Sequence, residues 1–558
     1  MNAPSVRPSV RSFVRSFVRS GLAPALGGGV GFLAFTRCVG VHTLDVRDLD
    51  WIPPGGIDPS VHLIGWHLFR SSPWGFPPGV TSDLGYPIGT SVALTDSIPL
   101  LALPFKAISP FLPHPFQYFG PWLLACFVLQ GVFGSLLMST VTNRTTLRAL
   151  GAALFVLAPI LSHRLGHAAL SAHWLLLAAL WLNRRAAASG LDRRAHVRWA
   201  VLVLAASATH PYLTVMVLAI AGATFLGQVT TARHIVTSVV LPCAVLGLIT
   251  FAVWWTAGYF IVPGDGTLQA SGFGRLSMNL LSPLIPREGA WTFGRIPLTT
   301  AQYDQHEGFS YLGLGVFTLL VVSVPLLRPW RTNWLTRPNL ALLVTLAGLT
   351  MFALSPTVTF GPSTIFQYDA GWWGPLATFR ASGRMFWPAV YALMFGVISL
   401  VVRRLPARVA VLALTVAVGL QAADVAGVYR LKRAGFALRF DNPLRSIFWR
   451  TLPGHYRHLV MYPSNMCVPP EQAMDYRPLA LVAGTAGLTF NGGYAARYDA
   501  DAVGRYCAHL TQDIQQGVFS DDTLYVVTSA EAPLLLASPM PLACVPVDGL
   551  VVCARGAS

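Results

Sequence analysis

Long apolar segments, interrupted by short charged ones, make up most of the chain as far as residue 428. A helix needs about 20 consecutive apolar residues to cross a bilayer core, with 17–25 the usual range. Several of the segments reach this length only with flanking residues, and together they predict eleven membrane-spanning helices. The predicted spans are 22–41, 115–138, 147–162, 168–182, 199–209, 212–230, 235–259, 309–327, 340–354, 385–402 and 409–428.

The apolar run at 98–112 is treated differently because it has only fifteen residues and contains Pro104, Lys106 and Pro110. These features favour an in-plane or re-entrant helix over a membrane span. With eleven spans and a cytoplasmic N-terminus, the inside segments hold 18 arginines and one acid, whereas the outside segments before residue 429 hold nine basic and eleven acidic residues. A twelfth span at 98–112 would invert this distribution, so the positive-inside rule supports eleven.

Composition supports a polytopic α-helical membrane protein. The chain is 54% apolar and only 11% charged, against about 45–50% and about 25% in soluble domains. The net charge of +16 accompanies no soluble nucleic-acid-binding module, so we relate it to orientation in the bilayer and expect no nucleic-acid partner. Residues 1–21 repeat arginine every four residues and predict a basic cytoplasmic tail, either an interfacial helix or an unordered segment.

The chain changes character after residue 428. Residues 429–558 alternate turn signals with short apolar runs and predict a soluble α/β domain on the outer, periplasmic side. Four of the seven cysteines lie here, and an even number suits an oxidising compartment. Of the three pairings open to them, we expect Cys467 with Cys507 and Cys544 with Cys553. The predicted organisation is therefore a tail (1–21), a membrane domain (22–428) and this outer domain.

The first outer loop, 42–97, concentrates the polar chemistry of the membrane domain. It holds six of the 23 acidic residues, interleaved with aromatic side chains, while residues 98–191 contain none. We therefore expect the active site in this loop. The six acids are Asp45, Asp48, Asp50, Asp58, Asp83 and Asp96.

Asp58 begins the most specific sequence of the loop. It precedes a proline, which predicts a helix with Asp58 as its N-cap and with His62 and Trp66 on one face. Trp66 and Trp74 would lay this helix in the membrane interface, where Asp58 could act as a general base. The alternative is a capping aspartate on a surface helix. Asp96 precedes the in-plane run, either as another cap or as a partner of Asp58 across a groove.

Arg380 and Arg384 lie four residues apart at the outer end of the tenth predicted span. A helix N-terminus already carries partial positive charge, so two arginines there lower stability unless an anion binds. A lipid phosphate is the expected anion. The alternative is that both arginines pair with acidic residues of the outer loops.

Further polar residues lie at the outer ends of other spans. His163 and His167 have the i, i+4 spacing of metal ligands, but a hydrogen-bond network between helices is the alternative for two histidines alone. Arg164, His210 and Glu307 occupy similar positions. We expect these residues to contact substrate.

Several sequences resemble known families of membrane proteins. They are DPSVHLIGWHLFRSSPW, YPIGTSVALTDSIPLLALPFK, HPFQYFGPWLL, GHAALSAHWLLLAAL and FRASGRMFWP. They are similar to a bacterial family of multispanning proteins of unassigned function, related to the GT-C class of membrane glycosyltransferases. The overall plan of spans, acidic first loop and outer C-terminal domain also resembles GT-C enzymes, and the resemblance covers roughly residues 42–430.

The resemblance implies chemistry. GT-C enzymes use an acid of the first loop as catalytic base and take a sugar from a polyprenyl-phosphate donor. Asp58 matches that acid by position, Asp96 is the reserve, and His62 would orient the acceptor. The adjacent pair of acids that some members carry is absent, which leaves open whether a divalent cation, Mg²⁺ or Mn²⁺, takes part.

The expected function is therefore transfer of a hexose or pentose to a periplasmic glycan or lipid acceptor at the bacterial inner membrane. The expected substrate contacts are Arg380, Arg384, Trp66, Arg70, Trp74, His163, Arg164, His167, His210 and Glu307. A flippase or transporter for a lipid-linked sugar, or a non-enzymatic envelope assembly protein, is the alternative. A transporter should place polar groups at mid-membrane, whereas this chain gathers them at one face.

Overall fold

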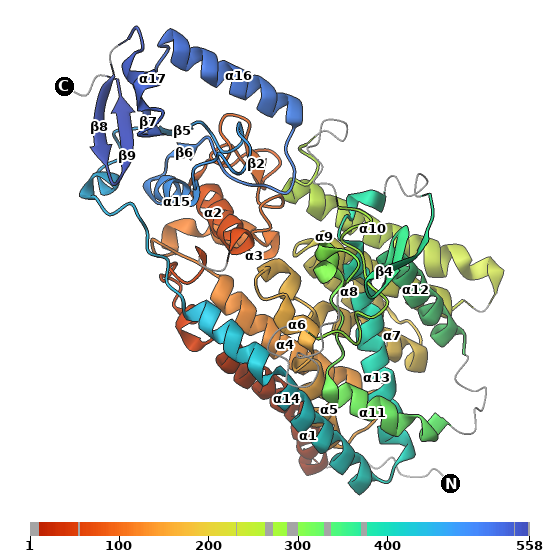
Figure 1. Ribbon diagram of the computed structural model, residues 1–558. Coiled ribbons are helices and arrows are strands. Elements are labelled where there is room, and N and C mark those ends of the chain that lie inside the picture. The colour runs from red at the N-terminus through yellow and green to blue at the C-terminus, as the bar shows by residue number, and fades with distance from the viewer. Residues whose placement is uncertain are drawn as a thin grey trace, which may run out of the picture.

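The computed structural model describes residues 10–53, 56–229, 231–262, 272–286, 300–327, 336–369, 376–540 and 542–555. A body of helices carries at one end a smaller domain built on a sheet (Figure 1). The helices of the body are α1 (Val10–Cys38), α2 (Ile57–Ser71), α3 (Pro99–Ala107), α4 (Phe119–Met138), α5 (Thr145–Val156), α6 (Pro159–His163), α7 (Trp174–Ser189), α8 (Arg193–Ser207), α9 (Pro211–Gly227), α10 (Leu241–Ala257), α11 (Leu314–Ser323), α12 (Arg337–Leu354), α13 (Trp387–Arg404) and α14 (Ala407–Ala437). Two short hairpins, β1 (Val80–Thr81) with β2 (Thr90–Ser91) and β3 (Thr357–Phe360) with β4 (Ser363–Gln367), lie in its loops.

The helical body is that of a membrane protein. Among the described residues, six helical segments are long and apolar enough to cross a membrane, and two shorter apolar helices accompany them. The six are Phe119–Met138, Thr145–His163, Val236–Ala257, Arg337–Leu354, Ser382–Arg404 and Ala407–Ala437. The predicted number of eleven spans exceeds these six and stays a prediction.

Small residues let the membrane helices approach closely. At the contact of α1 with α4, a Cβ on Gly31 would lie 2.1 Å from the carbonyl oxygen of Phe127, and one on Gly27 would lie 2.3 Å from that of Gly131. Close backbone approach is how helices gain packing energy in a bilayer, where lipid tails are as apolar as the side chains. The first helix is thereby fixed to the centre of the body.

The first outer loop folds into the protein. Helix α2 lies between the helical body and the sheet domain, and its residues from Ser60 to Arg70 are buried. Trp66 is fully buried, so the expectation that α2 lies in the membrane interface through this side chain was wrong. The predicted in-plane run at 98–112 forms α3 and a 3-10 turn at Ser109–Phe111. Both segments therefore build the end of the body that meets the sheet domain.

The C-terminal domain is α/β, as predicted. Its five-stranded sheet has the order β6-β5-β7-β9-β8; β5 is parallel to β6 and β7, and β9 is antiparallel to β7 and β8. Helix α14 continues to Ala437 before this domain begins. Its elements are β5 (His458–Tyr462), α15 (Arg477–Ala486), β6 (Thr489–Phe490), α16 (Ala500–Gln516), β7 (Thr523–Thr528), α17 (Ala532–Leu536), β8 (Ala543–Val547) and β9 (Leu550–Ala554).

Both expected disulfides are present, Cys467–Cys507 and Cys544–Cys553. Backbone hydrogen bonds also attach the domain to the first outer loop: Tyr86 N donates to the carbonyl of Phe490, and Phe490 N donates to that of Asp83. The loop and the sheet domain thus form one continuous structure above the membrane helices.

Candidate active site

Asp96 lies in the turn that leads into α3, and its carboxylate faces two histidines. Oδ2 is 3.4 Å from Nε2 of His167, and Oδ1 is 3.6 Å from Nε2 of His210. The ring of His62 on α2 lies 4.9 Å from that of His167, centroid to centroid. Four residues that are far apart in the sequence therefore meet at one point. With Asp58, described below, they are called the acid cluster.

The turn at Asp96 is held in an unusual backbone conformation. Its φ angle is 52°, in the left-handed region that costs a residue other than glycine about 1–3 kcal/mol. Ser97 fixes the turn against α2, because its Oγ donates a hydrogen bond to the carbonyl of His62 at 2.8 Å. Gly65 permits this approach, since a Cβ there would lie 2.3 Å from Oγ1 of Thr95. The sequence of α2 thus determines where the Asp96 carboxylate lies.

The ionisation states of the cluster follow from its burial and contacts. His210 caps α9, and its Nδ1 accepts a hydrogen bond from the backbone N–H of Tyr212 at 3.2 Å, which places the proton of the neutral ring on the nitrogen facing Asp96. Burial lowers the pKa of His210 to about 3 and that of His62 to about 4. Burial is the largest single influence on Asp96 and opposes its ionisation, but the hydrogen bond from His167 and the attraction of the surrounding histidines together outweigh it and lower the pKa of Asp96. A carboxylate and neutral imidazoles therefore coexist at neutral pH.

Three members of the acid cluster have the arrangement of metal ligands. His62, Asp96 and His167 each offer one ligand atom, and these atoms lie within 4.8 Å of one another. Within the described parts of the chain, Nδ1 of His167 is buried without a hydrogen-bond partner. Two imidazoles with one carboxylate suit Zn²⁺ or Mn²⁺, whereas Mg²⁺ prefers oxygen ligands throughout. The residues therefore fit a transition metal better than Mg²⁺.

Glu307 is the centre of an ion-pair network at the same site. Its Oε2 lies 2.8 Å from Nη1 of Arg164 and 2.8 Å from Nε of Arg384, and its side chain is only 14% exposed. Burial opposes ionisation of Glu307, but the two arginines hold the pKa of its carboxyl well below the ordinary value. Glu307 and Arg164, which were expected to contact substrate, neutralise each other in part, and Glu307 positions Arg384.

The two arginines predicted to bind an anion together differ in their contacts. Arg384 is paired with Glu307, which is the alternative that the sequence left open, and its guanidinium also lies 4.9 Å from the centre of the Tyr212 ring. The chain before α13 forms a 3-10 turn at Ser382–Phe386, so the two arginines do not share one α-helical face. Arg380 forms no ion pair with any described residue. Arg380 thus keeps its charge available.

One cavity of about 470 Å³ is lined both by the residues around Asp96 and by those around Arg384. It is lined by the acid cluster (Asp58, His62, Asp96, His167 and His210), by an arginine group (Glu307, Arg380, Arg384 and Arg497), and by aromatic residues that include Tyr212, Trp254, Tyr259, Phe260, Phe379 and Tyr494. We call it the polar cavity. Carboxylates, imidazoles and guanidinium groups therefore face the same enclosed space.

Asp58 lines this cavity from the start of α2. The helix begins at Ile57 with Gly56 as N-cap, so the prediction that Asp58 caps it was wrong. Pro59 is tolerated inside the first turn because the first N–H groups of a helix have no intrahelical partner. The Asp58 side chain is exposed and forms no hydrogen bond or ion pair with the described residues. It is the free carboxylate of the cluster.

Sequence reasoning missed the aromatic residues at the end of α10 and the contribution of the C-terminal domain. Tyr494 and Arg497 come from the segment after β6, and only their position beside a Gly-Gly pair hinted at an ordered loop. Trp254 and Tyr259 lie where the seventh predicted span ends, where aromatic residues are common for reasons unrelated to catalysis. Neither signal distinguishes a site from an ordinary surface.

Three predicted substrate contacts, Trp66 and Arg70 of α2 and Trp74 just after it, lie outside the polar cavity. Trp66 donates through Nε1 to the carbonyl of Phe116 at 2.8 Å. Arg70 donates to Oγ of Ser109 at 2.8 Å, and Trp74 is 54% exposed. The side chains of Trp66 and Arg70 attach α2 to the segment after α3, so their expected role in binding a sugar is corrected to a structural one; Trp74 is placed on the surface.

His163 lies at a second cavity of about 690 Å³, which is mainly apolar and is bordered by residues of α4 and α14. Its ring packs 4.5 Å from that of Phe309, and its Nε2 is 3.2 Å from the carbonyl of His306. His62 lines both cavities. His163 therefore lies near the acid cluster but does not line the polar cavity.

Comparison with known proteins identifies the family. A family model described as a domain of unknown function, DUF6311, matches residues 28–426, and the model of its C-terminal domain matches residues 448–555. The chain belongs to the DUF6311 family. No curated protein matches its sequence. The two matched regions of this DUF6311 protein correspond to the helical body and the sheet domain.

Solved structures of an oligosaccharyltransferase from Archaeoglobus fulgidus show low similarity. The form tethered to an acceptor peptide is 12% identical, with a TM-score of 0.48 over 97% of this chain and 75% of that chain. The AglB complex with an inhibitory peptide and a dolichol-phosphate is 10% identical, with a TM-score of 0.44 over 93% and 71%. The complex with Zn and sulfate is 10% identical, with a TM-score of 0.43 over 96% and 73%.

Proposed function

We propose that this protein is a GT-C-type glycosyltransferase that moves a sugar from a polyprenyl-phosphate donor to a glycan or lipid acceptor at the outer face of the membrane. The observation that carries the proposal is the polar cavity, which is lined by the carboxylate of Asp58 and the guanidinium of Arg380, neither of them ion-paired with a described residue. Transfer from a sugar phosphate needs a base for the acceptor hydroxyl and a cation for the departing phosphate.

Asp58 is the proposed base. Its carboxylate lines the cavity without a partner among the described residues, so it can accept a proton from an acceptor hydroxyl. Asp96 is less suited because His167 and His210 face its oxygens and stabilise its charge. Asp96 and His62 would instead position the acceptor. General-base assistance contributes about 10²–10⁴ in rate.

Arg380 and Arg384 would bind the phosphate. Arg384 is already oriented by Glu307, and Arg380 keeps an uncompensated charge. Guanidinium groups form forked, charge-assisted hydrogen bonds with phosphate oxygens, and these stabilise the negative charge that develops as the sugar leaves. The prenyl chain would leave past α10, where Phe260 lines the cavity and is 53% exposed.

The residues that would bind a metal ion are His62, Asp96 and His167, and their ligand atoms fit a transition metal. Such an ion would supply Lewis-acid polarisation of a substrate oxygen. The roles of the chain's own residues do not depend on it: Asp58 receives the proton and the arginines hold the phosphate.

The proposal is tested by glycan analysis in cells of the source organism. Envelope glycans and lipids of a strain lacking the gene are compared by mass spectrometry with those of strains complemented by the wild type, Asp58→Asn or the surface control Arg505→Gln. We expect one hexose or pentose increment to disappear in the deletion and Asp58→Asn strains and to return with the wild type and the control. An unchanged glycan profile in the deletion strain contradicts the proposal.

A further inference from the structure

The C-terminal domain extends a loop, 491–497, into the polar cavity. The backbone N–H of Ala496 donates to the carbonyl of Leu94 at 2.8 Å, two residues before Asp96 in the first outer loop. Arg497 donates through Nη2 to Oγ1 of Thr378 at 2.9 Å, close in sequence to Arg380. The loop therefore lies between the acid cluster and the arginine group, in contact with segments that carry both.

Arg497 has spare hydrogen-bonding capacity. A guanidinium has five N–H donors, and within the described residues Arg497 uses one of its nitrogens on a hydroxyl and forms no ion pair. Arg384 is already compensated by Glu307. In the part of the chain that the structure describes, Arg380 and Arg497 line the polar cavity without an ion-pair partner, one from each domain.

The backbone of the loop is fixed by side chains of the segment after β5. Oδ1 of Asn465 accepts from Gly493 N at 2.9 Å, and its Nδ2 donates to the carbonyl of Gly493 at 2.8 Å. Ser464 donates through Oγ to the carbonyl of Asn491 at 3.1 Å. Gly493 has a φ of 134°, and a Cβ there would lie 2.5 Å from the Leu84 side chain. Ser464 and Asn465 thus hold the backbone of the loop in place.

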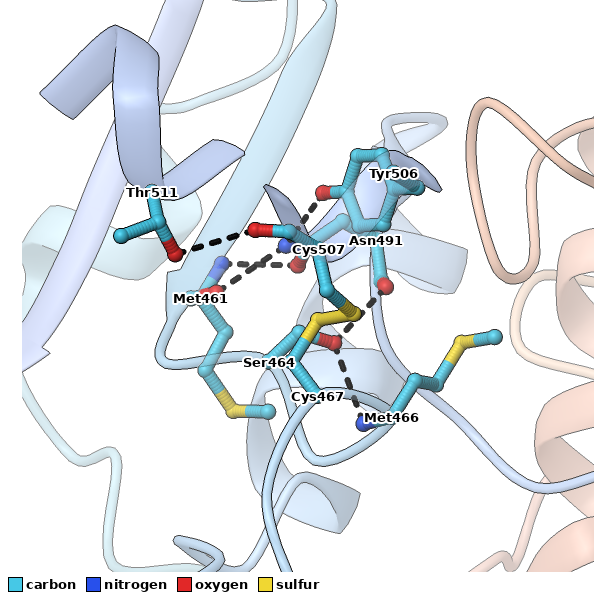
Figure 2. Close-up of a disulfide and its surroundings, with 8 residues drawn as sticks. All are labelled: Met461, Ser464, Met466, Cys467, Asn491, Tyr506, Cys507 and Thr511. Carbon is cyan, nitrogen blue, oxygen red and sulfur yellow. Dashed lines mark hydrogen bonds between the residues drawn. A yellow bond between two sulfur atoms is a disulfide. The ribbon is translucent and has the colours of Figure 1, made fainter. Parts of the chain in front are cut away.

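The Cys467–Cys507 disulfide ties that segment to α16, as Figure 2 shows. Within the same close-up, the Asn491 side chain bridges the backbone of Met461 and the hydroxyl of Tyr506, which is the neighbour of Cys507. Helix α16 begins directly after the loop, capped by Asp499. The disulfide therefore joins the two segments that flank the loop with Arg497, the segment after β5 and helix α16.

We propose that Arg497 binds the phosphate of the polyprenyl-phosphate donor, and that the Cys467–Cys507 disulfide positions it there. The inference rests on the proposed function and deepens it: the C-terminal domain supplies part of the donor site. The ligand is a phosphate on an apolar chain, a diester while the sugar is attached and a monoester once the sugar has left, and the guanidinium binds its oxygens by charge-assisted hydrogen bonds. The second disulfide, Cys544–Cys553, joins two strands at the edge of the sheet and takes no part in holding the loop.

The first experiment measures binding of a polyprenyl monophosphate to the purified full-length protein in detergent by thermophoresis. Loss of a hydrogen bond to a charged group is worth about 10–100-fold in affinity, so Arg497→Gln should raise Kd by that factor. Arg497→Lys, which keeps the charge but loses the fork, should recover part of the affinity. Arg505→Gln, an exposed arginine on α16, is the matched control and should bind as the wild type does.

Separate titrations with inorganic phosphate and with phosphatidylglycerol vesicles distinguish the sources of phosphate. We expect that neither inorganic phosphate nor phosphatidylglycerol competes with the polyprenyl phosphate at concentrations at which the polyprenyl phosphate saturates the protein. Equal affinity for phosphatidylglycerol, lost equally in Arg497→Gln, would assign Arg497 to lipid headgroups and overturn the inference.

The second experiment tests positioning by the disulfide. The Cys467→Ser/Cys507→Ser variant should lose affinity about as much as Arg497→Gln does, and adding Arg497→Gln to it should cause little further loss, because the two changes act through one contact. The Cys544→Ser/Cys553→Ser variant is the matched control and should keep its affinity. Melting temperatures of all variants show that the protein remains folded.

The outcomes separate the two claims. Wild-type protein that binds no polyprenyl phosphate contradicts both the proposed function and this inference. Wild-type binding with an unchanged Kd in Arg497→Gln contradicts the inference alone. Equal losses in the two disulfide variants, or full additivity with Arg497→Gln, contradict the role of the disulfide.

Discussion

The acid cluster and the arginine group share one cavity but are built in different ways. In the acid cluster, Asp96 is enclosed by histidines while Asp58 has no partner among the described residues. In the arginine group, Glu307 neutralises Arg164 and Arg384, while Arg380 keeps its charge. Among the described residues, each group therefore combines a charged residue that neighbouring side chains hold in place with one of the same charge that has no ion-pair partner.

This difference indicates how a buried polar site can be both stable and reactive. Groups that are fully paired fix geometry, because removing one partner leaves a buried charge uncompensated. Groups without partners are the ones that can exchange protons or bind an anion. We therefore assign positioning to Asp96 and Glu307, and chemistry to Asp58, Arg380 and Arg497.

Replacing the free carboxylate should have the largest effect on activity. Asp58→Asn should lower transfer by about 10²–10⁴-fold, because the amide cannot accept the acceptor proton. The side chain is exposed, so the melting temperature should stay that of the wild type. Turnover in membranes supplied with donor checks this, and wild-type turnover in Asp58→Asn would remove Asp58 from the mechanism.

Replacing the paired carboxylate should mainly affect stability. Glu307→Gln removes the carboxylate that Arg164 and Arg384 share in a mostly buried site, and breaking such a network costs about 3–5 kcal/mol. Thermal unfolding in detergent measures it. The matched control is Asp304→Asn, whose partner Arg275 is well exposed and whose loss should cost less than about 1 kcal/mol. Equal effects of the two changes would be inconsistent with this account.

Metal removal tests whether part of the acid cluster binds a metal ion. If His62, Asp96 and His167 hold an ion, dialysis against a chelator should lower transfer at least about tenfold, and Mn²⁺ or Zn²⁺ should restore it better than Mg²⁺. His167→Ala should abolish the restoration. Metal analysis of the purified protein provides an independent readout, and full activity of a metal-free preparation would exclude a metal role.

The pH dependence of stability tests the Glu307 network. Burial opposes ionisation of Glu307, but Arg384 and Arg164 depress its pKa, so its contribution to stability is complete above its unfolded value of about 4.5 and is lost only as the pH falls toward the folded value. The difference in melting temperature between wild type and Glu307→Gln should therefore stay constant from about pH 7 to about pH 5 and narrow only at lower pH. Narrowing above about pH 6 would contradict the depressed pKa.

The smallest effect is expected for a residue outside both groups. Trp74→Ala should leave transfer within about twofold of wild type, because Trp74 lies on the surface beside Lys106, with its ring 4.9 Å from Nζ, and does not line the polar cavity. A large loss of transfer activity in this variant would indicate that Trp74 contacts the substrate.

Much of the fold could be predicted from the sequence because its signals are local. Hydrophobic runs predicted a helical membrane body, the switch to short runs predicted the α/β domain, and the four cysteines of that domain form the pairing expected among the three possible ones. Asp58 and Asp96 were selected because the first outer loop concentrates the acids, and both line the polar cavity. Their catalytic roles remain proposals.

The rest depended on contacts between distant segments. Trp66 and Arg70 share a helix with His62, yet they face the segment after α3, and no local pattern tells which face of a doubly buried helix meets a cavity. The sequence alone could not show that Arg384 pairs with Glu307, which lies 77 residues earlier in the chain. Arg497 belongs to another domain altogether, and only tertiary packing brings it to the site.

The central claim is that the acid cluster and the arginine group act on one phosphorylated lipid donor in the polar cavity. A cryo-electron microscopy map of the protein with a bound polyprenyl phosphate tests this most directly. We predict that the phosphate lies within hydrogen-bond distance of Arg380 and Arg497, with its sugar-bearing oxygen directed toward Asp58. Density for the phosphate in the mainly apolar second cavity, away from the arginines, would contradict the account.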